Sequence, residues 1–290
     1  MKTHSLLSRA EFGDDEFVQV GGYQLHYAEA GKGPPVILIP GSFCTYRTWN
    51  SVIPRLSPRF RVLALDYLGT GDSDKPRSGF GYTVEEQADL IAEMISTLRL
   101  GKTHLVGASY GGAIALNMAA RHPKVVDKVV SIEGGIVKPK SMPSAPIEWL
   151  LRFPILGDLV ITAMRSGALN SLAMIAIAGA WYPHMTKNER RRMLQEQSFN
   201  IQSATRIPWH RISMAHQTTA PFEEEAKHIR APILYLYGEK SDFHTMTEEN
   251  IRFLREFIPH AQIKGFEDGI HDLQSQKPYE VAEAILEFLS

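Results

Sequence analysis

The chain has 290 residues, enough for one large α/β domain or for a core domain that carries an insertion. Its net charge of −1 gives no reason to expect nucleic acid or an anionic membrane as a partner. Cys44 is the only cysteine, so no intrachain disulfide can form and a reducing compartment is expected. No stretch resembles a secretory signal or is apolar for long enough to span a bilayer. These features predict a cytoplasmic protein with no membrane span.

Short apolar runs predict strands that are buried on both faces. They occupy residues 36–40, 61–66, 104–108, 128–133 and 232–238, with a weaker run at 261–266. Before them, residues 16–29 alternate around Gly21-Gly22, which predicts a β-hairpin. Helical patterns separate most of the runs; one opens with the capping box Thr83-x-x-Glu86 and the last begins at Pro278. This order predicts a mostly parallel, doubly wound sheet with an N-terminal antiparallel hairpin.

The alternation is interrupted once, between about Ile136 and Phe222. That segment has no buried-strand run, and it holds six of the ten Met residues and three of the four Trp residues. We interpret residues 136–222 as a helical cap inserted into a core made of residues 1–135 and 223–290. Such a cap needs a small core of its own, but Met-rich apolar surface is also typical of adaptable binding sites. We therefore expect the cap to supply walls of a lipophilic pocket.

The pattern Gly107-x-Ser109-x-Gly111 is weak by itself, but its context is specific. A buried strand precedes Ser109 and a helical pattern follows it, which is the strand–turn–helix setting of a nucleophile elbow. The two glycines remove side chains where strand and helix cross, so Ser109 can take a strained conformation with its hydroxyl exposed. The amide of Tyr110 then lies at the start of a helix, where it can stabilise an oxyanion.

A serine nucleophile needs a base, and position along the chain selects it from eleven His residues. His271 follows the last predicted strand and precedes the final helix, where the base is expected. His104 lies inside a buried strand and is expected in the core. His122 ends a helix, where it can bond carbonyls. His210 and His216 lie in the inserted segment and could contact substrate.

The carboxylate that orients the base is expected after the strand at 232–238. Asp242 is the best candidate, and Glu239, although nearer the strand, is interpreted as a solvated loop residue. Glu133 ends the preceding strand and could reach the same imidazole, so it remains an alternative. Asp268 and Asp272 are explained by local backbone hydrogen bonding.

Taken together, these segments resemble the α/β-hydrolase superfamily, specifically its cap-bearing lipases, esterases and C–C hydrolases. The resemblance covers nearly the whole chain. It rests on PGSFCTYRTW (40–49), DYLGTGDSDKP (66–76), GASYGG (107–112) and GIHDLQSQKPYEVAEAILEFL (269–289). It implies that Ser42 supplies the second oxyanion amide, with Phe43 as the alternative.

The chain departs from the family pattern at two places. Pro40 stands where the family usually has His, in the loop that shapes the oxyanion site. The acid segment reads Gly238-x-x-Ser241-Asp242 instead of the commoner Gly-x-x-Asp, which keeps Glu133 open as the acid.

Other site classes fit poorly. The glycines at 68–74 lack the third glycine and the helix of a dinucleotide fingerprint, and no phosphate loop or His/Cys metal pattern occurs. We therefore expect no cofactor and no metal. A serine at the elbow also argues against the dehalogenase and epoxide-hydrolase branches, which use Asp there.

The sequence thus predicts a serine hydrolase that cleaves an ester of a small lipophilic molecule through an acyl-enzyme. C–C bond hydrolysis of a β-diketone or vinylogous diketone is the alternative enzyme hypothesis. A slow-turnover small-molecule receptor is the non-enzymatic one. Candidate pocket residues are Phe43, Trp149, Trp181 and Trp209. The sequence does not indicate an oligomeric state.

Overall fold

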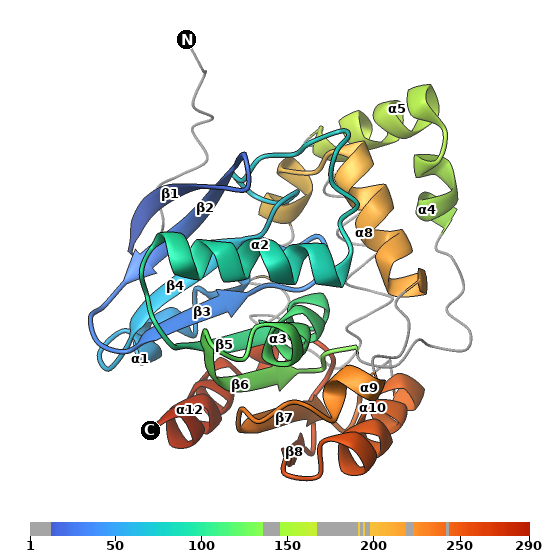
Figure 1. Cartoon of the computed structure of the whole chain (residues 1–290). Coiled ribbons are helices and arrows are strands. Elements are labelled where there is room, and N and C mark those ends of the chain that lie inside the picture. Colours follow the sequence, from blue (N-terminus) through green and yellow to red (C-terminus); the bar gives the residue numbers. More distant parts are fainter. Residues whose placement is uncertain are drawn as a thin grey trace.

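The computed structural model describes residues 13–135, 146–166, 198–218, 223–241 and 244–290, and the single positions 191 and 194. Its centre is an eight-stranded sheet in the order β1-β2-β4-β3-β5-β6-β7-β8, with helices on both faces (Figure 1). Strands β1 (Asp14–Val20) and β2 (Tyr23–Ala30) form an antiparallel hairpin, and β2 also pairs antiparallel with β4. All other pairs are parallel, which confirms the predicted fold class.

The six apolar runs of the sequence form the six remaining strands. These are β3 (Pro35–Ile39), β4 (Arg61–Asp66), β5 (Thr103–Ala108), β6 (Val126–Ile132), β7 (Ile233–Gly238) and β8 (Gln262–Phe266). The order places the carboxyl ends of β5, β6, β7 and β8 side by side at one edge of the sheet. Functional groups carried by loops after these strands therefore gather at that edge.

The predicted helices are also present. Helix α2 (Val84–Thr97) begins at the capping box, where the Glu86 amide donates to Thr83 Oγ1 at 3.2 Å. Helix α3 (Tyr110–Arg121) begins three residues earlier than the apolar pattern suggests, because Ser109 alone completes the turn from strand to helix. Outside the stretch between β6 and β7, the other described helices are α10 (His244–Phe257), α12 (Pro278–Leu289), and the short η1 (Tyr46–Trp49), α1 (Ile53–Leu56) and α11 (Leu273–Gln276).

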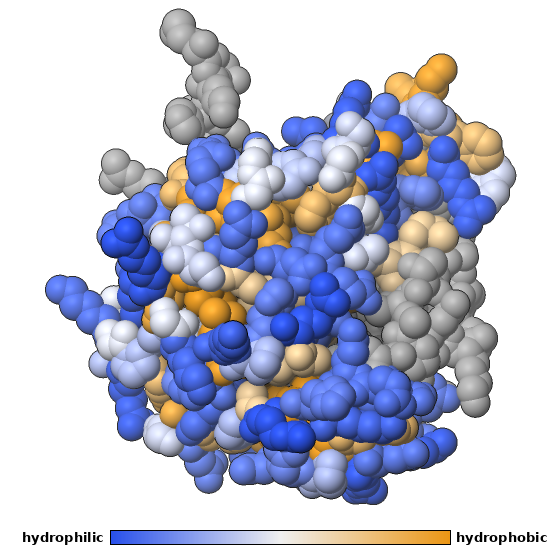
Figure 2. Space-filling view, viewed as in Figure 1, coloured by the Kyte–Doolittle hydropathy of each residue, from blue (hydrophilic) through white to orange (hydrophobic). Residues whose placement is uncertain are grey.

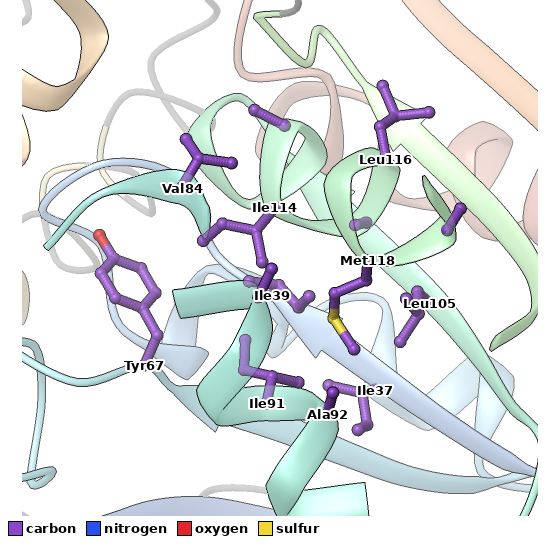
Figure 3. Close-up of a cluster of buried hydrophobic side chains, with 14 of the residues drawn as sticks. Ile37, Ile39, Tyr67, Val84, Ile91, Ala92, Leu105, Ile114, Leu116 and Met118 are labelled. Atoms are coloured by element: carbon purple, nitrogen blue, oxygen red, sulfur yellow. The ribbon is translucent and has the colours of Figure 1, made fainter. Parts of the chain in front are cut away.

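Two buried clusters cover the two faces of the sheet, as the alternation of side chains along each strand requires. In β3, Ile37 and Ile39 face the cluster under α2 and α3, whereas Val36 and Leu38 face the cluster under α1 and α12. Figure 3 shows the first of these clusters, with Tyr67 among its members.

The described helices between β6 and β7 are α4 (Pro146–Leu151), α5 (Pro154–Arg165), α8 (Arg206–Thr218) and α9 (Glu223–Ala226). Helices α4, α5 and α8 lie to one side of the sheet (Figure 1), around a separate apolar cluster. Its buried members are Leu151, Ile161, Ile201, Ala204 and Trp209. On the outer face of α5, Ile155 and Leu159 are 80% and 61% exposed, and apolar surface is visible there in Figure 2. No described helix has both the length and the apolar character needed to cross a membrane.

A buried ion pair joins the hairpin to the central strands. His26 Nδ1 on β2 lies 2.8 Å from Oδ2 of Asp66 at the end of β4. Burial opposes ionisation of Asp66, but bonds from His26 and from the amides of Tyr46 and Asp72 hold the pKa of this carboxyl below its ordinary value. Ligand-type atoms of His26, Asp66 and Asp72 lie within 4.8 Å of one another. Both oxygens of Asp66 already accept hydrogen bonds, so we interpret the group as structural.

Candidate active site

Ser109 occupies a sharp turn between β5 and α3, in the strained conformation that a nucleophile elbow requires. Its φ of 51° and ψ of −115° are sparsely populated for a residue with a side chain, at a cost of about 1–3 kcal/mol. A Cβ on Gly107 would collide with the carbonyl of Gly111, and one on Gly111 would collide with the carbonyl of Ile39. Only glycine fits at both positions, so the elbow spacing has a steric cause.

The loop after β3 runs directly past Ser109. A Cβ built on Gly41 would lie 3.4 Å from the Ser109 Cβ, an ordinary van der Waals distance. The loop turns sharply, because the Cys44 amide donates to the Gly41 carbonyl at 3.1 Å and Phe43 has a φ of 64°. Ser42 is thus part of a tight turn beside the elbow.

The side-chain hydroxyl of Tyr67 stabilises this turn. This hydroxyl donates a hydrogen bond to the Gly41 carbonyl at 3.0 Å and accepts one from the Phe43 amide at 3.0 Å. One phenol thus binds the residues on both sides of Ser42. Tyr67 is fully buried, and burial raises its pKa well above the ordinary value. The phenol therefore keeps the proton that it donates. This brace supports the loop in which Pro40 stands where the resembled family usually has His.

The brace bears on the choice between the two candidate oxyanion amides. The Phe43 amide is directed at Tyr67, so it serves the loop and not a substrate. That engagement argues against Phe43. Sequence reasoning missed Tyr67, although its position immediately after the buried run 61–66 places it at the carboxyl end of a strand, where site residues gather.

Tyr110 is the first residue of α3, so its amide lies at the positive end of the helix. Its side chain points into the core: the hydroxyl donates to the Tyr82 carbonyl at 2.7 Å, and the ring lies 5.4 Å from that of Tyr67. The two tyrosines therefore hold the elbow and the neighbouring loop through one buried contact.

His271 lies in the loop after β8, as the sequence predicted, and its side chain is 16% exposed. Gln276 holds this loop from α11, because its side chain accepts the Ile270 amide at 2.8 Å and donates to the Asp268 carbonyl at 2.9 Å.

Glu133 directly follows β6, where it is completely buried and has a φ of 50°. Its Oε2 lies 3.6 Å from His271 Nδ1. Its oxygens also accept shorter bonds: Oε1 from the Gly238 amide at 2.7 Å, and Oε2 from Thr247 Oγ1 at 2.8 Å. The carboxylate therefore ties β6 to β7 and α10, with one oxygen near the imidazole.

Asp242, the preferred acid, lies outside the described residues. The loop that leads to it is described as far as Ser241 and is attached to the His271 loop, because the Lys240 amide donates to the Gly269 carbonyl at 2.9 Å. The Glu239 amide similarly donates to the Phe266 carbonyl at 3.0 Å.

The candidate pocket residues are distributed unequally. Phe43 and Trp209 are in contact, with ring centroids 4.8 Å apart, so helix α8 meets the loop beside Ser109. Trp149 is 53% exposed and packs edge-on against Phe153 at 4.9 Å, on an outer face. Trp181 lies outside the described residues.

Asn200 adds a polar link between the insertion and the same loop, which the sequence did not indicate. Its Oδ1 accepts both the amide and the hydroxyl of Thr45, each at 2.9 Å. Nearby, the Arg47 guanidinium lies 4.5 Å from the Phe199 ring centroid. Residues 43–47 are thus attached to the inserted segment by aromatic, cationic and hydrogen-bonded contacts.

Two of the other candidate histidines have structural partners. His104 is 6% exposed and packs against Phe60, with ring centroids 5.9 Å apart, in agreement with a core position. His122 contacts the carboxylate of Asp89 at 2.6 Å, whereas a carbonyl partner was expected. His210 lies on α8 in the insertion, where burial and neighbouring arginines lower its pKa.

Comparison with known proteins agrees with the fold. A family model of the alpha/beta hydrolase fold matches residues 34–278. The soluble epoxide hydrolase of Corynebacterium sp. (strain C12) is 33% identical over 121 residues, covering 41% of this chain and 42% of that protein. The 2-hydroxy-6-oxo-6-(2'-aminophenyl)hexa-2,4-dienoic acid hydrolase of Metapseudomonas resinovorans is 38% identical over 120 residues, covering 40% and 41% respectively. The chain thus spans about two fifths of the length of these curated relatives.

A solved structure extends the match to nearly the whole fold. The enol-lactonase from Burkholderia xenovorans LB400 has a TM-score of 0.75 at 20% identity, over 94% of this chain and 99% of that one. At this identity, the likeness concerns the fold.

Proposed function

Because the chain belongs to the alpha/beta hydrolase fold family, we propose that it is a serine hydrolase that cleaves an ester of a small lipophilic molecule. The observation that carries this proposal is the strained elbow at Ser109, next to a braced loop that contains Ser42. A serine held in a costly conformation beside two backbone turns is suited to attack a carbonyl and to bind the oxyanion that forms.

In this proposal His271 takes the Ser109 proton as the hydroxyl attacks the carbonyl carbon. The amides of Ser42 and Tyr110 bind the developing oxyanion, each contributing about 3 kcal/mol of barrier lowering. Collapse of the tetrahedral intermediate expels the alcohol, which receives the proton from His271. Water then enters, loses a proton to His271 and attacks the acyl carbon, and the acid is released as His271 returns that proton to Ser109.

We assign the orienting acid to Asp242, with Glu133 in support. The loop that leads to Asp242 is hydrogen bonded to the His271 loop through Lys240 and Gly269, which favours an acid at that position. Glu133 Oε2 lies outside hydrogen-bond range of His271 Nδ1 and is engaged by Thr247, although its charge stabilises an imidazolium.

The inserted segment, residues 136–222, is proposed to act as the cap that forms the acyl pocket. The contact of Trp209 with Phe43 supports this role, because it brings an aromatic wall of the insertion to the loop beside Ser109. Trp149, on an outer face, is a weaker pocket candidate.

C–C bond hydrolysis is the second candidate function. It is favoured by one observation, the 38% identity to the hexadienoic acid hydrolase of Metapseudomonas resinovorans. The same Ser109, His271 and acid would serve, but the leaving group would be a carbon acid in place of an alcohol.

A direct test measures hydrolysis of p-nitrophenyl acetate, butyrate and octanoate by the wild type and by Ser109→Ala. We expect turnover that increases with acyl length in the wild type and disappears in the variant. A vinylogous diketone assayed in parallel separates the two chemistries. Equal slow rates for wild type and variant on both substrates would instead support a receptor.

A further inference from the structure

A cavity of about 360 Å³ lies apart from the candidate triad, where the insertion meets the core. Three segments line it: the loop after β4, helix α5, and the start of α8 with the two residues before it. Its lining residues are Lys75, Arg77, Asp158, Ile161, Thr162, Arg165, Ala204, Thr205, Arg206, Ile207 and Pro208. None of the proposed catalytic residues is among them.

The charge of this lining is strongly one-sided. Lys75, Arg77, Arg165 and Arg206 are cationic, and Asp158 is the single acid among the lining residues. Asp158 pairs with Arg206, with Oδ1 and Nε 3.1 Å apart. Their charges cancel, and the other three cations leave the cavity with a net charge of +3.

The three cations that remain, Lys75, Arg77 and Arg165, have no anionic partner among the described residues. Lys75 Nζ donates to the carbonyls of Gly71 and Ser73, which carry no charge to balance it. Burial lowers the pKa of Lys75, although Asp66, Asp72 and Asp74 act against that effect. Among the described residues, no carboxylate lies within ion-pair distance of Lys75, Arg77 or Arg165.

Thr205 gives an independent indication. Thr205 is one of the lining residues, and its Oγ1 is buried and has no hydrogen-bond partner among the described residues. A buried hydroxyl without a partner costs about 1–3 kcal/mol, and rotation of the Thr205 side chain toward an acceptor in the cavity would recover it. Two guanidinium groups, an ammonium and a hydroxyl around one cavity are the donors that a phosphate group prefers.

We propose that this cavity is a binding site for a small molecule that carries a dianionic phosphate group. The lining supplies three cations that form no ion pair among the described residues, and the volume admits more than a phosphate alone, so an organic phosphate fits the site. Its phosphate would join the loop after β4 to α5 and to the start of α8. Because α8 also carries Trp209, which packs on Phe43, the ligand would hold the insertion against the loop beside Ser109.

Isothermal titration with inorganic phosphate and with phenyl phosphate tests the site, in the wild type and in Ser109→Ala. Sodium chloride at matched ionic strength controls for screening. We expect saturable 1:1 binding in both proteins, so the result is independent of hydrolysis. Tighter binding of phenyl phosphate would indicate an organic phosphate, and equal affinities would indicate the free anion.

Three variants locate the site. Arg165→Glu should weaken phosphate binding about tenfold or more, and Thr205→Val should weaken it about threefold without a change of charge. Arg152→Glu is the matched control, because Arg152 is an exposed arginine of the same insertion that lies outside the cavity. No saturable binding by the wild type, or equal losses in Arg165→Glu and Arg152→Glu, would overturn the proposal.

Discussion

Oε2 of Glu133 lies 3.6 Å from Nδ1 of His271, within ion-pair range but beyond the length of a hydrogen bond. The same carboxylate accepts two shorter bonds, from the Gly238 amide and the Thr247 hydroxyl. This geometry fits a buried support that adds negative potential to the site and leaves the orienting acid to Asp242, which is proposed for that role.

The assignment of the acid therefore predicts unequal effects of two isosteric changes. Asp242→Asn should lower kcat about 10⁴-fold, because the imidazole would adopt the wrong tautomer. Glu133→Gln should lower kcat less, and should lower the free energy of unfolding by about 1–3 kcal/mol, because an amide cannot accept at both positions. Ester hydrolysis and urea unfolding of both variants measure these effects. A larger loss of kcat in Glu133→Gln would identify Glu133 as the acid.

Removal of the Tyr67 hydroxyl should loosen the oxyanion loop. We expect Tyr67→Phe to lower kcat about 10- to 100-fold with little change in KM, because the misplaced Ser42 amide matters most in the transition state. Affinity for a boronic acid analogue should fall in parallel, while affinity for the product acid should not.

Tyr235→Phe is the matched control for that experiment. Tyr235 on β7 is also a fully buried phenol, and its hydroxyl accepts a hydrogen bond from Asn250 Nδ2 at 3.2 Å. This variant should lose some stability but keep its kcat. Equal kcat losses in the two variants would show that Tyr67 contributes only to folding.

The contact between the insertion and the core predicts different consequences for two tryptophans. Trp209 is 8% exposed and packs on Phe43, so Trp209→Ala should lower the free energy of unfolding by about 3 kcal/mol and reduce activity on long acyl chains. Trp149 is 53% exposed, so Trp149→Ala should change stability by less than about 1 kcal/mol. Urea unfolding curves with equal midpoints for the two variants would contradict the packing described.

The ion pair between β2 and β4 predicts a pH dependence of stability. Burial works against the charge of His26, but the bond to Asp66 and its charge raise the pKa of the imidazole above 6.5. The folded state then binds the proton more tightly than the unfolded state, so this contribution is complete below pH 6.5 and is lost as pH rises through the folded pKa. Stability should therefore decline above neutral pH.

His26→Gln should remove that part of the decline, as followed by urea unfolding at a series of pH values. His104→Gln is a suitable comparison, because burial lowers the pKa of His104 and its pH effect has the opposite sign. Parallel curves of stability against pH for the wild type and His26→Gln would show that the pair contributes nothing to the pH dependence of stability.

The sequence allowed the sheet, the hairpin and the elbow to be predicted, because each follows from local rules. Buried runs, the glycines at 107 and 111 and the capping box at Thr83 are all visible within a few residues. Tyr67, Asn200 and the cationic cavity were not predicted, because they depend on residues brought together from distant segments. Thr45 and Asn200 are 155 positions apart, and no periodic pattern connects them.

The most direct measurement of the central claim is covalent trapping of the nucleophile. Intact protein is incubated with a fluorophosphonate ester, and the modified peptide is identified by mass spectrometry. We predict one adduct, on Ser109, that is absent in Ser109→Ala and forms much more slowly in His271→Ala. An adduct on another residue, or p-nitrophenyl ester turnover by Ser109→Ala at the wild-type rate, would contradict the assignment of Ser109 as nucleophile.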